Sequence, residues 1–267
     1  MAEVTKSEPG IFCWAELGTT DGEAAKKFYT ELFGWGILDV PLGPEGGVYT
    51  MLQVAGKEVG ALYQMGERER AQGVPPHWLL YVGVASADES AERVGALGGK
   101  VLAPPFDVND NGRMAVIEDP AGATCALWEA RGHQGWGRAG EPNTVCWSEL
   151  ATRDAAAAGG FYEGLFGWQA DAQPMGDFTY TYFKVDVGHG DRMAAGMIQM
   201  TEEWCGAPSH WMPYFAVEDC DATTDKARFL GAEIRVPPTE APGVGKFSVM
   251  ADPQGAAFSI IKLNQQG

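Results

Sequence analysis

The first segment of the chain alternates between hydrophobic and polar positions in the way that is typical of a β-strand. Residues 11–17 read Ile-Phe-Cys-Trp-Ala-Glu-Leu, and successive side chains of a strand point to opposite faces. We therefore expect Phe12, Trp14 and Glu16 to share one face, and Cys13 to lie on the other.

A helix and three further strands are predicted after this strand. Thr20-Asp21 offers a helix N-cap, apolar residues follow at helical spacing, and Gly34 is placed to end the helix. Strand-like segments then cover residues 37–40, 48–54 and 59–65. The first 65 residues thus predict one βαβββ unit.

The next part of the chain repeats this order. A strand is predicted over residues 77–84, a helix over 88–97 that ends at Gly98-Gly99, and strands over 101–103, 114–118 and 124–128. The first half therefore consists of two βαβββ units.

The second half of the chain repeats the first at a spacing of 133 residues. Self-similarity at a fixed period indicates an internal duplication, and the boundary falls in the Gly-rich linker 131–142. The pattern predicts an α+β protein of two tandem domains, residues 9–131 and 142–264, with four βαβββ modules in all. The matching pairs are Cys13-Trp-Ala-Glu-Leu17 and Cys146-Trp-Ser-Glu-Leu150, Phe28-Tyr29 and Phe161-Tyr162, His77-Trp78 and His210-Trp211, and Asp119-Pro-Ala-Gly122 and Asp252-Pro-Gln-Gly255.

The repeated segments Phe28-Tyr-Thr-Glu-Leu-Phe-Gly-Trp35 and Phe161–Trp168, with the late Asp-Pro-x-Gly turns, resemble the vicinal oxygen chelate superfamily. That superfamily includes glyoxalase I, bleomycin-resistance proteins and extradiol dioxygenases, and the nearer likeness is to two-domain bacterial glyoxalase-like proteins, some of them called hydroxylases. The resemblance covers almost the whole chain. It implies that paired modules curl into a mixed sheet whose concave cleft binds a ligand.

The resemblance also implies where a metal would be bound, namely on the first and last strands of the modules. Divalent metals need His, Glu or Gln there, because they require convergent N or O donors. The residues at the matching positions do not supply such a set, so we expect no metal and no other cofactor, although a divalent metal remains the alternative. These positions hold Trp14, Leu79 and Ala126 in the first half, and Trp147, Met212 and Ser259 in the second.

A glutamate and a histidine recur at matching places in both halves. An isolated carboxylate on an apolar strand is costly unless it has a partner. If Trp14 lies opposite Leu79, an antiparallel pairing brings Glu16 to His77, and likewise Glu149 to His210. Such a pair could act in acid–base catalysis, orient a ligand or only satisfy itself. A neighbouring carboxylate would raise the pKa of both histidines.

Aromatic residues on the expected concave faces could stack against a flat, partly apolar ligand. Trp128 becomes Ile261 in the second half, and Glu129 becomes Lys262, so the two clefts need not bind the same molecule. Arg113 and Lys246 occupy equivalent positions, where a solvated cation or an anion-binding group would fit. The expected cleft residues are Trp14, Leu79, Tyr81, Ala126, Trp128, Trp147, Met212, Tyr214 and Ser259.

Charge and composition limit the classes of partner that the protein is expected to bind. The formal net charge is −17, from 19 Lys and Arg against 36 Asp and Glu, which disfavours nucleic acid and anionic membranes. No apolar signal segment or membrane-length run appears, and five cysteines without a CxxC pair suggest reduced thiols. We expect a cytoplasmic protein whose partner is a small molecule; self-association is left open.

Two functions stay open at this point. Retained aromatic residues and missing metal ligands favour a protein that binds a small, partly apolar ligand without chemistry. Survival of Glu16, His77, Glu149 and His210 in both copies allows an enzyme instead: a lyase, an isomerase, or an oxygenase of the dioxygenase or hydroxylase kind.

Overall fold

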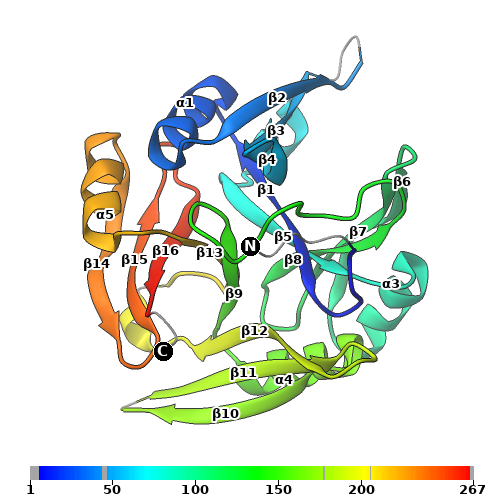
Figure 1. Cartoon of the computed structure of the whole chain (residues 1–267). Helices are drawn as coiled ribbons and strands as arrows, with labels where there is room; N and C mark the ends of the chain where they lie inside the picture. The colour runs from blue at the N-terminus through cyan, green and yellow to red at the C-terminus, as the bar shows by residue number, and fades with distance from the viewer. Residues whose placement is uncertain (1–5, 44–46, 177, 205, 265–267) are drawn as a thin grey trace.

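The computed structural model describes residues 6–43, 47–176, 178–204 and 206–264. Each half of the chain forms one eight-stranded sheet with helices on one of its faces (Figure 1). The first half contains β1 (Phe12–Thr19), α1 (Gly22–Phe33), β2 (Gly36–Pro41), β3 (Val48–Val54), β4 (Lys57–Gln64), α2 (Glu67–Ala71), β5 (His77–Gly83), α3 (Ala87–Ala96), β6 (Lys100–Val108), β7 (Gly112–Glu118) and β8 (Thr124–Ala130). The second contains β9 (Val145–Thr152), α4 (Ala155–Phe166), β10 (Gln169–Met175), β11 (Phe178–Asp186), β12 (Asp191–Gln199), the 3-10 helix η1 (Glu202–Trp204), β13 (His210–Ala216), α5 (Cys220–Phe229), β14 (Glu233–Ala241), β15 (Gly245–Ala251) and β16 (Ala257–Leu263).

The predicted βαβββ order is confirmed in all four modules. The first sheet has the order β2-β3-β4-β1-β5-β8-β7-β6, and the second has the matching order β10-β11-β12-β9-β13-β16-β15-β14. Within each sheet the two modules meet where their first strands pair antiparallel, β1 with β5 and β9 with β13. The first strand of each module is parallel to its last, so the sheets are mixed. The helices α2 and η1 are additions between the modules.

The ends of the long helices follow from local sequence. The Asp21 side chain accepts a hydrogen bond from the Ala24 backbone N–H at 3.0 Å and caps α1. Gly34 ends the helix with φ 70°, a left-handed conformation that glycine adopts without steric cost. The same two devices recur in α4, where Asp154 is the N-cap and Gly167 ends the helix with φ 71°. Both copies of the helix are therefore defined by the residues that flank them.

One detail of the first strand differs from the prediction. A β-bulge lies between Phe12 and Trp14, so that Phe12 is paired with Val82 while Trp14 is paired with Tyr81. An extra residue in a bulge moves the side chains before it to the other face. Phe12 therefore packs against the second domain, with its ring centroid 4.8 Å from that of Trp211, and does not share a face with Trp14.

The two domains are joined by a pair of equivalent buried contacts. The Tyr29 hydroxyl of α1 donates to Asp252 in the second domain at 3.0 Å, and the Tyr162 hydroxyl of α4 donates to Asp119 in the first at 3.1 Å. Each tyrosine also accepts a hydrogen bond from an indole N–H, of Trp78 and Trp211 respectively. The repeated Phe-Tyr and Asp-Pro-x-Gly segments of the sequence are therefore partners across the domain interface.

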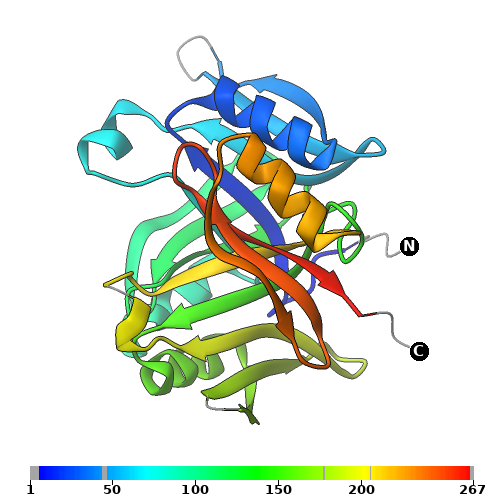
Figure 2. The same ribbon diagram turned by 90° about the vertical axis from the view of Figure 1, so that its left-hand side faces the viewer.

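Helices and aromatic rings complete this interface. Figure 2 shows α1 and α5 side by side, and contacts between them, like those between α3 and α4, join the domains. Phe33 and Trp78 of the first domain both pack on Phe215 of the second, with ring centroids 5.2 and 5.4 Å apart. One continuous buried core consequently spans both domains.

No helix in the described ranges is long and apolar enough to cross a membrane. Four of the five cysteines, Cys13, Cys125, Cys146 and Cys220, are free thiols, as the sequence suggested. Cys205 lies outside the described residues.

Candidate functional site

The face of each sheet opposite the helices is concave and carries the residues that the sequence singled out. Opposed residues of neighbouring strands share a face. In the second domain Glu149 lies opposite Met212, and Trp147 opposite Tyr214, which is itself paired with Ser259. The first domain places Glu16, Leu79, Trp14, Tyr81 and Ala126 in the same arrangement.

The expected pairing of each glutamate with a histidine is wrong, because the strand register is two residues away from the one predicted. Trp14 lies opposite Tyr81 rather than Leu79, so Glu16 faces Leu79, and His77 faces Gly18. In the second domain His210 lies opposite Ala151. Each histidine is therefore a diagonal neighbour of its glutamate on the same face.

Both glutamates are held by two tyrosines instead. The Tyr180 hydroxyl donates to one carboxylate oxygen of Glu149 at 2.7 Å, and the Tyr214 hydroxyl donates to the other at 2.8 Å. The indole N–H of Trp147 donates in turn to the Tyr180 oxygen at 2.9 Å. These contacts link a carboxylate, two phenols and an indole on one apolar face.

The first domain repeats this arrangement. Glu16 accepts hydrogen bonds from Tyr49 at 2.6 Å and from Tyr81 at 3.1 Å, and Trp14 donates to the Tyr49 oxygen at 3.3 Å. Burial raises the pKa of Glu16 and of Glu149, although the tyrosine hydrogen bonds oppose the shift. Each carboxyl therefore keeps its proton to a higher pH than an exposed glutamate.

The histidines have backbone partners. Nδ1 of His77 lies 2.9 Å from the Pro75 carbonyl oxygen, and Nδ1 of His210 lies 2.8 Å from that of Pro208. Burial, with a smaller effect of the Arg235 charge, lowers the pKa of His210. The predicted rise is thus wrong for His210, because no carboxylate of the described residues pairs with it.

The residues at the family's metal positions do not form a ligand set. Trp14, Leu79 and Ala126 supply no carboxylate or imidazole, and in the second domain the Ser259 hydroxyl donates to the Met212 sulfur at 2.8 Å. Within the part of the chain that the structure describes, no group of three or more His, Cys, Asp or Glu side chains is placed to hold a metal ion. The donors present therefore do not fit a metal centre.

The linker between the domains covers part of the first concave face. The His133 ring packs edge-on against Trp14, with centroids 4.6 Å apart, and its Nε2 lies 3.0 Å from Glu58. The Trp128 indole N–H donates to the His133 carbonyl at 3.1 Å. Trp14 is consequently only 4% exposed.

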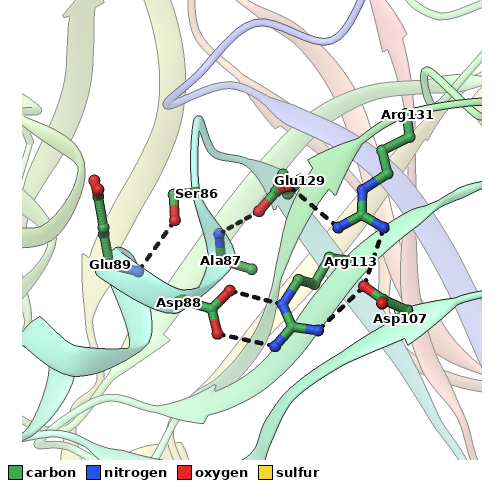
Figure 3. A network of polar contacts seen from close by, with 8 residues as sticks. All are labelled: Ser86, Ala87, Asp88, Glu89, Asp107, Arg113, Glu129 and Arg131. Atoms are coloured by element: carbon green, nitrogen blue, oxygen red, sulfur yellow. Dashed lines mark hydrogen bonds and ion pairs between the residues drawn. The ribbon is translucent and has the colours of Figure 1, made fainter.

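A network of charged residues fixes the strand end from which this linker starts (Figure 3). Arg131, the first linker residue, forms ion pairs with Asp107 and Glu129, and Glu129 also accepts a hydrogen bond from the backbone of Ala87 at the start of α3. Arg113 joins Asp107 to Asp88 of the same helix. Arg113 is thus an ion-paired residue rather than a free anion-binding group, and Lys246 is paired in the same way with Asp221 and Glu240.

Among the described residues, which end at Asn264, no counterpart of His133 packs on Trp147. Trp147 is half-buried where Trp14 is buried. Met212, Tyr214 and Ile261 form a small cluster separate from the main core, against which Trp147 and Phe247 pack. This partly exposed aromatic face with the Glu149 carboxylate is the best candidate for a binding site among the described residues.

Sequence reasoning missed the role of Tyr49 and Tyr180. Both stand in a repeated Tyr-Thr pair, Tyr49-Thr50 and Tyr180-Thr181, on strands that are not sequence neighbours of the strand that carries the glutamate. The signal that could have identified them is the coincidence of a repeated tyrosine with a repeated glutamate that lacks a partner.

Comparisons with known families agree with this architecture. The model of the Glyoxalase/Bleomycin resistance protein/Dioxygenase superfamily matches residues 12–127, and a model of a glyoxalase-like domain matches residues 145–261. The protein named "Putative glyoxylase CFP32" of Mycobacterium bovis is 40% identical over 254 residues, which cover 93% of each chain. The "Anthracycline biosynthesis protein DnrV" of Streptomyces peucetius is 34% identical over 272 residues, covering 98% of this chain and 96% of the relative.

Solved structures share the fold at low sequence identity. A mutant of 4-hydroxymandelate synthase from Streptomyces coelicolor superposes with a TM-score of 0.63 at 15% identity, covering 97% of this chain and 94% of the other. The Mn(II)-bound glyoxalase from Novosphingobium aromaticivorans gives 0.62 at 17% identity, covering 96% and 83%. At this identity the likeness concerns the fold alone.

Proposed function

Because the chain belongs to the glyoxalase/bleomycin resistance/dioxygenase superfamily, we propose that it binds a small, flat, partly apolar molecule on the concave face of its second domain, without a metal ion. The observation that carries the proposal is the difference between the two faces. The aromatic face of the second domain is accessible at Trp147, whereas the linker buries Trp14 in the first.

The residues of this face support a planar ligand. Aromatic side chains offer large apolar surfaces on which flat molecules stack. Trp147 and Phe247 pack against the separate apolar cluster, and the Tyr182 ring centroid lies 6.4 Å from that of Trp147. The name of the Streptomyces relative mentions anthracyclines, which contain fused planar rings. A hydroxylated anthraquinone is therefore a reasonable first probe.

Two neighbouring substitutions on β16 test this site. Ile261→Trp gives the second domain the residue that the first carries as Trp128, and it would fill the concave face. Lys262→Glu gives the residue carried as Glu129, on the opposite side of the strand, and is the matched control. Titration of the full chain with 1,8-dihydroxyanthraquinone, followed by quenching of tryptophan fluorescence, should give saturable binding for the natural protein and the control. Binding should weaken at least tenfold in Ile261→Trp.

Either of two results would contradict the proposal. Quenching that does not saturate would show that the face takes no such ligand. Equal affinity of Ile261→Trp and the natural protein would place the ligand elsewhere.

A second candidate is an enzyme of the same superfamily, a lyase, isomerase or oxygenase. It is favoured by the carboxyls Glu16 and Glu149, because burial raises the pKa of both, and a glutamate that keeps its proton to a higher pH can act as a general acid. Turnover of the hemithioacetal of methylglyoxal and glutathione, measured before and after dialysis against a chelator, tests lyase activity and its metal dependence. Activity that survives dialysis but is lost in Glu149→Gln would support a metal-free enzyme.

A further inference from the structure

The polar groups on the second concave face accept hydrogen bonds more readily than they donate them. Both carboxylate oxygens of Glu149 are acceptors, and the hydroxyls of Tyr180 and Tyr214 are already used as donors to them. A bound molecule therefore meets oxygen atoms whose nearby donors are engaged. A site for carboxylates or phosphates needs free hydrogen-bond donors, which this arrangement does not offer.

His210 adds a nitrogen acceptor to the same face. A backbone carbonyl can only accept, so the contact to the Pro208 oxygen requires the proton on Nδ1. In the neutral ring Nε2 then carries a lone pair, and the hydrogen bonds of the described residues leave this atom without a partner. Burial favours the neutral ring, since it lowers the pKa of His210.

His210 lies on the same face as Glu149. It is opposite Ala151, two residues beyond Glu149 on β9, and is therefore a diagonal neighbour of the glutamate. The Glu149 oxygens already accept hydrogen bonds from Tyr180 and Tyr214, so Nε2 of His210 is the acceptor on this side of the face that a ligand can use.

The cations of the second domain do not make this face a site for anions. Lys184 is paired with Asp171, Lys246 with Asp221, and Arg192 with Glu8 of the N-terminal segment. Arg153 donates to the carbonyl oxygens of Thr201 and Ala207. Arg235 is the cation that affects His210, and its side chain is exposed with Glu233 3.9 Å away. The net charge of −17 disfavours anions further.

We propose that the second-domain site selects uncharged aromatic ligands that carry a hydroxyl donor, such as phenols or enols, and that His210 Nε2 accepts the hydrogen bond from that hydroxyl. The selectivity rests on the proposed function, because it concerns a ligand on the same face. A ligand without the donor covers Nε2 of His210 without pairing it, and sites that leave a polar group unpaired in this way reject such analogues strongly. An anionic ligand would be repelled by the negative charge of the Glu149 carboxylate.

Three probes of similar size test this selectivity by isothermal titration calorimetry on the full chain. 2-Naphthol carries the donor, 2-methoxynaphthalene lacks it, and 2-naphthoate is an anion. We expect 2-naphthol to bind at least tenfold more tightly than either of the others. His210→Phe should reduce the preference for 2-naphthol over 2-methoxynaphthalene at least fivefold, while the affinity for 2-methoxynaphthalene is kept.

His189→Phe is the matched control, because His189 lies in an exposed loop with Glu8 3.7 Å away; its preference should equal that of the natural protein. Equal binding of the three probes would overturn the selectivity and leave the proposed function standing. An unchanged preference in His210→Phe would overturn the role of His210. If none of the probes binds, the proposed function fails together with the inference.

Discussion

At the scale of single residues, the buried glutamates are the most unusual feature of the molecule. Glu16 and Glu149 each lie on an apolar face, and each is accommodated by two tyrosine hydroxyls rather than by a cation. A neutral donor satisfies a carboxylate without cancelling its charge, so desolvation still dominates and raises both pKa values. Each carboxyl is thus neutral at pH values where an exposed glutamate is already charged.

This raised pKa predicts how stability depends on pH. Below the ordinary glutamate pKa of about 4.5 the carboxyl is neutral in the folded and the unfolded chain. As the pH rises toward the folded-state pKa, the unfolded chain ionises first, so the free energy of unfolding falls, by about 1.4 kcal/mol for each unit of pKa difference. Glu149→Gln should remove the part of this fall that comes from Glu149 and leave the part from Glu16. Urea unfolding between pH 4.5 and 8 measures the difference.

Glu31→Gln, on the exposed side of α1, is the control for loss of one carboxylate. A pH dependence that is the same in Glu149→Gln and in the natural protein would mean that Glu149 is ionised as readily when folded as when unfolded.

At this scale the predicted pairing of the repeated glutamates and histidines was wrong. Glu16, His77 and their copies were found because they are polar residues repeated on apolar strands. Their partners depend on the register between β1 and β5, which is set by a β-bulge at Phe12 and by the connection through three intervening strands and two helices. Alternation in one strand carries no information on that register.

At the scale of secondary-structure elements, prediction from sequence was accurate because local signals define most of them. The strand over 48–54 was predicted with the limits that β3 has, and the Asp21 cap and Gly34 end of α1 are both observed. The strand β6 is longer than predicted, Lys100–Val108 instead of 101–103, since two prolines interrupt its pattern. The linker over the first concave face was not predicted, because nothing in a Gly-rich polar segment indicates where it packs.

The packing of β11 on β12 gives a prediction for one glycine. A Cβ atom on Gly196 would lie 1.9 Å from the Tyr180 hydroxyl oxygen and 2.8 Å from Nε1 of Trp147. Gly196→Ala should therefore displace Tyr180 from Glu149 and lower the free energy of unfolding by about 1–3 kcal/mol. Chemical unfolding measures this loss.

Gly160→Ala is the matched control. Gly160 lies inside α4, where an added Cβ meets nothing within 4 Å, and alanine there should stabilise the protein by about 0.5–1 kcal/mol. A Gly196→Ala variant as stable as the natural protein would show that Tyr180 is not confined to the position near Glu149.

At the scale of the whole molecule, the duplication has produced two domains with one shared core and different faces. The parts that bind the domains together are kept in both copies: the Tyr29–Asp252 and Tyr162–Asp119 contacts, and the indole N–H groups of Trp35 and Trp168, which donate to Asn143 and Gly10 across the interface. The concave faces differ, with Trp128 and the linker in one and Ile261 in the other. The interface is thus the common feature of the two halves, and ligand binding is proposed for only one.

The shared interface predicts that the two domains unfold together and that each tyrosine contributes to both. Tyr162→Phe removes the donor to Asp119 and leaves the buried Trp211 indole N–H, now 2.7 Å from the hydroxyl oxygen, without an acceptor. Such an unsatisfied group costs about 1–3 kcal/mol, and Tyr29→Phe should cost a similar amount for the same reason. Tyr182→Phe is the control, because the Tyr182 hydroxyl has no hydrogen bond among the described residues. This variant should change stability by less than about 0.5 kcal/mol.

Calorimetric melting should show one transition for the natural protein and lower transition temperatures for Tyr29→Phe and Tyr162→Phe. Two separate transitions in the natural protein, with only one of them moved by Tyr162→Phe, would show that the domains are stable independently and that the shared core does not couple them.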